Sequence, residues 1–249
     1  MAFTDALFLE TTLQVERVFG SERIKRLINE AVRGRSLITS TYVLMEFKRT
    51  ITSDFVNFYN ALEQEENISE ALAQLAKSYG RHSSRYLLIL SVILRERRTL
   101  NKEKTLEILS RYIRWDLRRR FYRGIDHVID ETQCPLSVKE PVFENGFYSL
   151  DVTCRKGENP CKVSELIREN LEDVKKIFEA LKGAPSAKGM VELLGKVVED
   201  PKEMDGRTCQ LLGDVVIVLE APRDTPILTT DRLYRLICEA IGKKYHIFS

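Results

Sequence analysis

Two carboxylates near the end of the chain stand where a lone charge is unusual. Asp214 is the only charged residue in the apolar run from Leu211 to Leu219, and Asp231 directly follows the strand-like run 226–230. A carboxylate in an apolar setting is unfavourable unless it is paired, protonated or bound to a cation. These two acids therefore indicate a partner, and a metal ion is the obvious candidate.

Two further acids extend this pair into a possible site. Glu10 ends the short apolar run 6–10, and Glu46 lies in a helix-like segment just after the apolar run 36–39. Carboxylates that share a site raise one another's pKa, and a divalent cation removes that conflict. Hard oxygen ligands suit Mg²⁺ or Mn²⁺. The predicted catalytic and metal-binding residues are Glu10, Glu46, Asp214 and Asp231.

The elements that would position these acids alternate between strand and helix. Apolar runs at 6–10 and 36–39 are typical of buried strands, and helical spacing of apolar residues fills 13–31 between them. Residues 209–248 read as helix, strand, helix, strand. Such alternation predicts an α/β fold with a central parallel sheet and helices on both faces. Ligands bind such sheets at the carboxyl ends of the strands, where these acids fall.

The middle of the chain follows a different pattern. Residues 54–130 predict several helices with no strand signal, and residues 141–154 predict a β-hairpin that turns at Asn145-Gly146. We therefore expect one α/β domain in two halves, 1–53 and 205–249. A mainly helical insertion, 54–204, would separate them and carry the small hairpin.

Four segments resemble the PIN-domain family of metal-dependent ribonucleases: 8–12 (FLETT), 38–48 (ITSTYVLMEFK), 212–214 (LGD) and 227–231 (ILTTD). The resemblance covers residues 1–53 and 205–249. It implies a three-layer PIN-like domain and endoribonuclease activity, with the four acids named above as ligands of Mg²⁺ or Mn²⁺. It also implies supporting hydroxyls near the metal at Thr12 and at Thr229 or Thr230.

The chain departs from the family in two places. The family usually carries Asp where this chain has Glu10, and small toxin-type members lack the long insertion. An extra methylene displaces the carboxylate, and metal geometry tolerates little displacement. Two alternatives therefore stay open beside the ribonuclease: a catalytically degenerate PIN-like RNA-binding or scaffold protein, and a toxin-like nuclease controlled by a partner protein.

Positive charge is concentrated in one part of the insertion. Residues 81–123, which we call the basic arm, contain thirteen Lys or Arg and four acids, although the whole chain carries a net charge of only +2. Such a segment predicts a polyanion partner: RNA, single-stranded or structured, with DNA not excluded. Interleaved aromatic residues would stack on bases, or would instead form the core of a bundle whose basic face is solvated. The candidate contacts are Arg97, Arg98, Arg111, Arg114, Arg118, Arg119, Arg120 and Arg123.

Four of the five cysteines lie in or beside the later part of the insertion 54–204: Cys134, Cys154, Cys161 and Cys209. Five cysteines in 249 residues do not make a disulfide scaffold. A structural Zn²⁺ or an iron–sulfur cluster would join these segments. Because the spacings are long and no Cys-x-x-Cys pair occurs, reduced structural cysteines are the simpler interpretation.

Several functional classes are excluded or disfavoured. The N-terminus lacks a basic region before its apolar residues, so it is not expected to be a secretory signal. The apolar run Leu87–Leu94 is too short to span a bilayer. Neither a phosphate-binding loop nor a dinucleotide-binding glycine motif is present. We expect a cytoplasmic protein without membrane contact, and leave open a homodimer or a regulatory protein partner.

Overall fold

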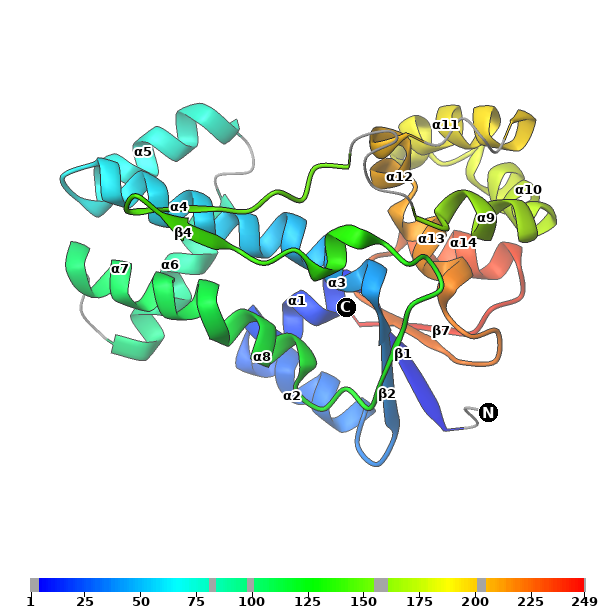
Figure 1. Cartoon of the computed structure of the whole chain (residues 1–249). Coiled ribbons are helices and arrows are strands. Elements are labelled where there is room, and N and C mark those ends of the chain that lie inside the picture. Colours follow the sequence, from blue (N-terminus) through cyan, green and yellow to red (C-terminus); the bar gives the residue numbers. More distant parts are fainter. Residues whose placement is uncertain (1–4, 81–83, 98–100, 155–160, 201–204, 249) are drawn as a thin grey trace.

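The computed structural model describes residues 5–80, 84–97, 101–154, 161–200 and 205–248, and contains a five-stranded parallel sheet (Figure 1). The strand order is β3-β2-β1-β6-β7, and all four neighbouring pairs are parallel. The strands are β1 (Ala6–Leu9), β2 (Ser36–Ser40), β3 (His127–Ile129), β6 (Ile227–Thr229) and β7 (Tyr245–Ile247). The predicted α/β class and the parallel sheet are confirmed.

Helices cover both faces of this sheet because successive side chains of a strand point to opposite faces. Leu7 and Leu9 of β1 pack in a small cluster with Leu13 and Ile28 of the first two helices. Phe8, between them, joins the larger core, which includes the residues of the last two helices. These four helices are α1 (Thr11–Phe19), α2 (Glu22–Ala31), α13 (Gly213–Glu220) and α14 (Leu233–Ala240).

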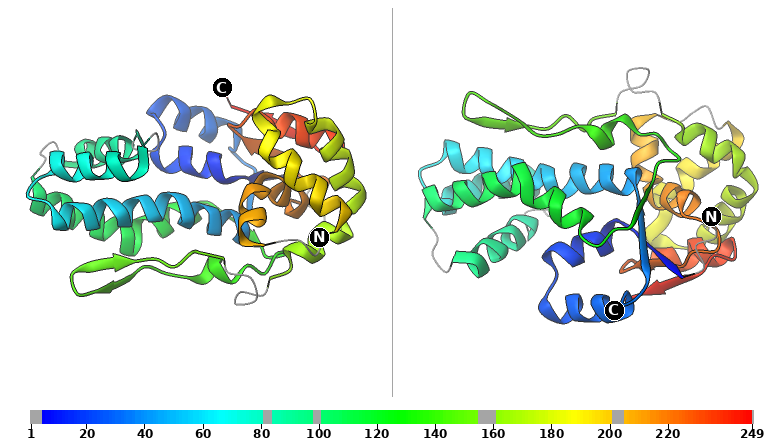
Figure 2. Two further views of the ribbon diagram at one scale, coloured as in Figure 1. Left: turned by 90° about the horizontal axis from the view of Figure 1, so that it is seen from above. Right: turned by 60° about the horizontal axis from the view of Figure 1, so that its bottom comes forward.

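A helical lobe connects β2 to β3 and extends to one side of the sheet (Figures 1 and 2). Its centre is a set of fully buried aromatic rings, among them Phe55, Tyr86 and Tyr112. Among the described residues, no helix is both long and apolar enough to cross a membrane. The lobe contains α3 (Thr41–Phe47), a π-helical turn (Lys48–Thr52), α4 (Ser53–Gln64), α5 (Ile68–Tyr79), α6 (Ser84–Arg97), α7 (Lys102–Arg111), a second π-helical turn (Tyr112–Asp116) and α8 (Leu117–Tyr122).

Strand β3 corrects the predicted course of the middle of the chain. We expected no strand within 54–130, yet β3 forms one edge of the sheet and pairs with β2 through Ile38 and His127. Asp126 strengthens the junction, because its amide donates to the Leu37 carbonyl and its carboxylate accepts from the Leu37 amide. A three-residue, largely exposed strand is too short to give a periodic signal. The chain therefore returns to the sheet within 54–204 to add β3. This segment consists of two crossover connections, from β2 to β3 and from β3 to β6, and is not one continuous insertion.

The second crossover, from β3 to β6, begins as an extended segment with the predicted hairpin. Strands β4 (Val142–Glu144) and β5 (Phe147–Ser149) are antiparallel, and Asn145 and Gly146 turn with φ of 51° and 87°. This turn favours Asn-Gly, so the hairpin prediction is confirmed. The hairpin packs on α4, where Asn60 hydrogen-bonds the backbone of Tyr148. The remaining elements are two 3₁₀ turns (Pro135–Val138 and Pro185–Ala187), α9 (Val163–Glu169), α10 (Leu171–Leu181), α11 (Lys188–Glu199) and α12 (Gly206–Leu211).

Candidate functional site

The four predicted acids come from four elements around the carboxyl ends of β1 and β6. Glu10 follows β1, and Asp231 lies two residues after β6. These strands are neighbours at the point where the strand order reverses direction, which is where open α/β sheets bind ligands. Glu46 lies on α3 and Asp214 on α13. Residues more than 200 positions apart thus meet at one edge of the sheet.

Glu10 is held against the start of α1. Its Oε2 accepts a hydrogen bond from the Thr12 amide at 2.6 Å, and its Oε1 accepts one from the Leu13 amide at 2.9 Å. The Thr12 hydroxyl also contacts Glu10 and lies 2.7 Å from the hydroxyl of Thr230. Both oxygens of this buried side chain therefore serve as the N-terminal cap of α1.

Glu46 is packed closely against the start of α13. Its Oε2 accepts a hydrogen bond from the Thr11 hydroxyl at 2.7 Å, and its Oε1 lies 3.9 Å from Nη2 of Arg49. A Cβ added at Gly213 would stand 2.1 Å from the same Oε1. Glycine lets α13 come this close without displacing the Glu46 carboxylate, and the contact sets Glu46 beside Asp214, the next residue.

The electrostatics show that these acids affect one another. Burial is the main cause that raises the pKa of Glu10 and that of Glu46 to about 7 each, and the Asp214 carboxylate contributes to both shifts. Burial and the neighbouring Asp231 raise the pKa of Asp214 to about 6. Arg49 opposes the shift at Glu46 but does not cancel it. The edge of the sheet therefore holds a carboxylate cluster that is short of positive charge.

Asp231 also has a local role in the turn after β6. Its Oδ1 accepts a hydrogen bond from the Leu233 amide at 2.8 Å, and its own amide donates to the hydroxyl of Thr229 at 2.9 Å. Thr229 is thus committed to this turn, whereas Thr230 reaches across to Thr12. Of the predicted hydroxyls, Thr12 and Thr230 lie at the carboxylate cluster.

Two residues of the cluster were missed at the sequence level. Tyr234 of α14 is fully buried, and Asp214, Glu10 and Glu46 all raise its pKa beyond the effect of burial. Arg49 is the cation nearest to Glu46. Each lies three residues after a predicted acid, so helical spacing was an available signal, although it is too common to identify a site alone.

The donor set suits a hard divalent cation in its chemistry, but the side chains do not yet surround one point. In the described part of the chain, no three His, Cys, Asp or Glu side chains are arranged, as they stand, to hold a metal ion. Glu10 would have to turn from the α1 amides to become a ligand. A cavity of about 290 Å³ opens beside the cluster, lined by Thr11, Thr12 and residues of α4 and α6.

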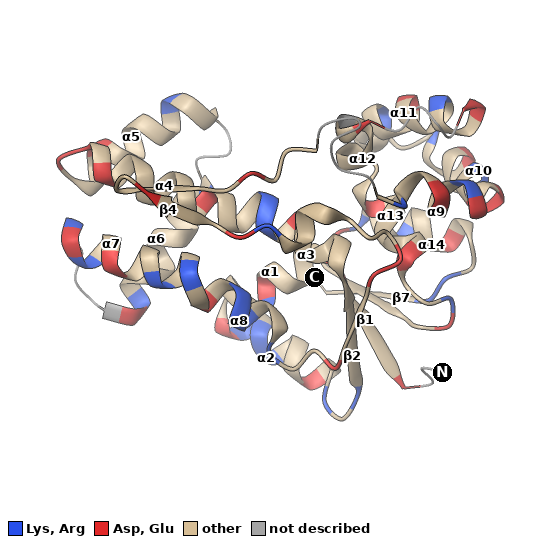
Figure 3. Cartoon of the chain, viewed as in Figure 1, with Lys and Arg blue, Asp and Glu red and all other residues tan. Residues whose placement is uncertain are grey.

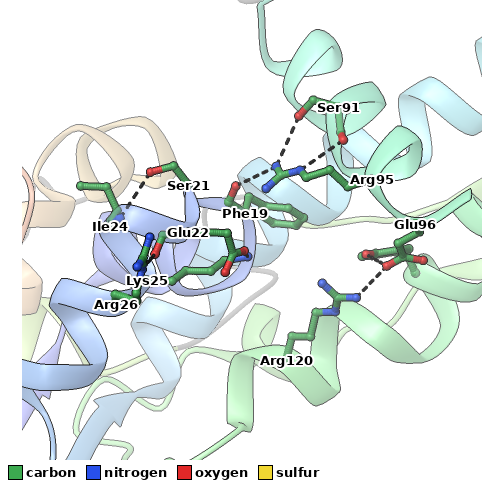
Figure 4. Close-up of polar contacts among 11 residues, drawn as sticks. Phe19, Ser21, Glu22, Ile24, Lys25, Arg26, Ser91, Arg95, Glu96 and Arg120 are labelled. Carbon is green, nitrogen blue, oxygen red and sulfur yellow. Dashed lines mark hydrogen bonds and ion pairs between the residues drawn. The ribbon is translucent and has the colours of Figure 1, made fainter. Parts of the chain in front are cut away.

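Most basic-arm residues whose side chains the structure describes make contacts within the protein. Figure 3 shows where Lys and Arg lie along the ribbon, and Figure 4 shows Arg95 and Arg120 with their partners. Arg111 and Arg120 both pair with Glu96. Arg114 donates to the Tyr148 hydroxyl at 2.7 Å, and Arg118 lies 3.4 Å from Glu140. Of the other predicted contacts, Arg97 ends α6, and Arg98 lies outside the described residues.

Arg119 and Arg123 instead line a cavity of about 1080 Å³ between α8 and the first two helices. Arg17, Lys25 and Arg120 line it too, with Asp116 as the one acid among the described lining residues. Lys25 pairs with Glu22 at its edge (Figure 4). Burial and the neighbouring Arg123 lower the pKa of Arg17 to about 10. We call this the arginine cavity, and its unbalanced positive charge suits an anion.

The aromatic residues of the basic arm divide between core and surface. Tyr86, Tyr112 and Phe121 are fully buried, so for them the bundle-core interpretation holds. Trp115 is 70% exposed and precedes α8, which lines the arginine cavity. It is therefore the aromatic ring of this group with a free face.

The four cysteines of the second crossover meet in space. Cys134, Cys154, Cys161 and Cys209 all line one small cavity, together with Arg49 and Gly206. They are free thiols rather than disulfides. Burial raises the pKa of Cys134 to about 11 and that of Cys209 to about 12, with the neighbouring thiols adding to both shifts. Cys238 is separate, buried in α14.

Comparisons with known proteins identify no relative of this chain. No family model, no curated protein and no solved structure matches it.

Proposed function

We propose that this protein is a metal-dependent endoribonuclease of PIN-like architecture. The observation that carries the proposal is the carboxylate cluster: Glu10, Glu46, Asp214 and Asp231 stand at the ligand-binding edge of the sheet, and the pKa values of the first three are raised. Buried acids that lack counter-charge are costly to maintain, and clusters of perturbed acids are common at functional sites. The proposal is also supported by the resemblance of four segments to the PIN-domain ribonucleases: 8–12, 38–48, 212–214 and 227–231.

Mg²⁺ or Mn²⁺ would be held by the carboxylates, with Glu46 and Asp214 already adjacent. When bound, such an ion lowers the pKa of a coordinated water and stabilises the leaving oxygen of a phosphodiester. The chain's own groups orient the site. Thr12 and Thr230 steady the turns that bear Glu10 and Asp231. Tyr234 keeps its proton because its pKa is raised, so it remains a hydrogen-bond donor among the acids.

RNA would be bound by the arginine cavity and Trp115. Arg119 and Arg123 have no ion pair within the described residues, and Arg17 beside them is partly buried next to a like charge. Phosphates would supply the missing negative charge, and the exposed indole would stack on an unpaired base. Because Trp115 is the only tryptophan of the chain, quenching of its fluorescence by single-stranded RNA reports contact at this surface.

The deciding experiment measures cleavage of single-stranded RNA with Mn²⁺, with Mg²⁺ and with a chelator. Asp214→Asn should lower the rate more than about 100-fold, beyond the usual effect of losing an outer partner of a metal site. Asp224→Asn, which alters an exposed acid ten residues further on, should leave the rate unchanged. Equal rates in Asp214→Asn and wild type, or full activity with chelator, would overturn the assignment.

A second candidate function is RNA binding without cleavage. It is favoured by Glu10, whose oxygens are both occupied by amides of α1. Under this alternative the wild type binds RNA and quenches Trp115, but cleaves no RNA with either metal.

A further inference from the structure

The cysteine cavity brings together four cysteines that are spread over residues 134–209. Cys134 precedes the 3₁₀ turn Pro135–Val138, Cys154 follows β5, Cys161 precedes α9, and Cys209 lies on α12. Four of the five cysteines of the chain thus line one cavity. Close approach is built into the backbone, because a Cβ at Gly206 would stand 2.2 Å from the Cys154 carbonyl oxygen.

We propose that Cys134, Cys154, Cys161 and Cys209 form a tetrathiolate metal centre. Four thiolates select thiophilic metals, either a single Zn²⁺ or an iron–sulfur cluster. The cavity has a volume of about 10 Å³, which accommodates one ion and favours zinc over a cluster of several atoms. The side chains as they stand in the described part of the chain do not surround one point, so the sulfurs would turn toward the cavity to reach metal–sulfur distances of about 2.3 Å.

Arg49 supplies a second, independent observation. It lines the cysteine cavity, and its buried Nη1 has no hydrogen-bond partner within the described residues. Zn²⁺ with four thiolates carries two net negative charges, and a guanidinium beside it compensates one of them. The opposite nitrogen, Nη2, is the one that approaches Glu46. Arg49 thus stands between the cysteine cavity and the carboxylate cluster.

The position of the cavity explains what a metal would do. The extended segment between β3 and α9 runs along the helical lobe and returns toward α12 (Figures 1 and 2), and its hairpin exposes Val142, Phe143 and Phe147. A segment with so little core of its own gains stability from a metal that joins its two ends. Tyr42 of α3 donates to the Cys209 carbonyl at 2.7 Å, which ties the centre to the helix that bears Glu46.

The test begins with the full-length wild-type chain, expressed with zinc and iron available and purified without chelator. Elemental analysis should give about one zinc per chain, or about four irons with matching sulfide and visible absorbance if the centre is a cluster. X-ray absorption at the metal edge should show four sulfur neighbours at about 2.3 Å. Neither measurement needs a variant, so neither depends on whether a substituted chain folds.

Variants then assign the ligands. Replacing any one of the four cysteines with alanine should lower the bound metal at least tenfold, whereas Cys238→Ala should retain it. A chain with no bound zinc or iron, whose thiols all react equally with and without chelator, would overturn the proposal. So would metal with oxygen and nitrogen neighbours, or metal retained in all four variants. These readouts do not involve RNA, so they stand or fail independently of the nuclease assignment.

Discussion

A Cβ added at Gly213 would stand 2.1 Å from Oε1 of Glu46, so these two residues fit only because one of them has no side chain. Gly213 is the first residue of α13 and directly precedes Asp214. The close contact places two acids from distant parts of the chain side by side. It also offers a way to disturb the cluster without removing a carboxylate.

Gly213→Ala should displace the Glu46 carboxylate while leaving the fold intact. The clashing atom is the end of a flexible side chain, which can move without a shift of the backbone. We expect the free energy of unfolding to change by no more than about 1 kcal/mol, and Mn²⁺ affinity to fall about tenfold, as for other lost supporting contacts. Calorimetric titration with Mn²⁺ and urea unfolding measure both quantities.

Gly195→Ala is the matched control, because its Cβ would make an ordinary contact of 3.6 Å with Phe178. If Gly213→Ala and Gly195→Ala bind Mn²⁺ equally well, Glu46 is not positioned by Gly213 for metal binding.

The carboxylate cluster should make stability fall as pH rises. The pKa of Glu10 and that of Glu46 are raised from the ordinary 4.5 to about 7, so the folded state keeps protons that the unfolded state has lost. The contribution of these two raised pKa values to the free energy of unfolding is therefore fully present below about pH 4.5 and is lost as pH rises through about 7. Asp214, with a pKa of about 6, contributes between about pH 4 and 6.

Urea unfolding between pH 4.5 and 8 without divalent ions tests this dependence. Glu46→Gln should show a shallower decline than wild type, while surface carboxylates titrate alike in both proteins. Mn²⁺ should restore stability to the wild type above pH 7, where the acids are ionised. Identical pH profiles for wild type and Glu46→Gln would contradict the raised pKa of Glu46.

Substitutions at Glu10 should separate its capping role from metal binding. Aspartate is a preferred N-cap residue, so Glu10→Asp should keep the free energy of unfolding within about 1 kcal/mol of wild type. Glu10→Ala leaves the amides of Thr12 and Leu13 without their acceptor and should lose about 1 kcal/mol. If Glu10 is also a ligand, Glu10→Asp retains RNA cleavage with Mn²⁺ and Glu10→Ala does not. Cleavage by both variants at the wild-type rate would leave Glu10 as a helix cap only.

The arginine cavity should account for much of the RNA affinity. Replacing Arg119 and Arg123 together with alanine removes two cations and should weaken binding of single-stranded RNA about tenfold. The slope of log affinity against log salt should fall by about 1–2. Fluorescence anisotropy of labelled RNA over a salt series measures both effects. Arg168→Ala, an exposed arginine on α9, is the control and should change neither.

Unchanged affinity after loss of Arg119 and Arg123 would direct attention to the paired arginines. Arg111, Arg118 and Arg120 would then have to leave Glu96 and Glu140 to reach RNA.

The fold class and the candidate acids could be predicted from the residues within each segment. Strands β1, β2 and β6 are short apolar runs that periodicity recognises, and Asn145-Gly146 encodes the hairpin turn because few other residues accept positive φ. Asp214 and Asp231 were recognisable because a charge in an apolar run is costly. Strand β3 was not recognisable, since three largely exposed residues carry no pattern and form a strand only against β2.

Which side chains meet depends on how the distant segments pack against one another. The capping of α1 by Glu10 depends on local backbone geometry. The close approach of Gly213 to Glu46 and the pairing of Arg111 and Arg120 with Glu96 join residues of different helices. The convergence of four cysteines with irregular spacing is of the same kind. Periodicity and composition report on each residue's own segment, whereas ion pairing, burial and the pKa depend on neighbours that folding alone supplies.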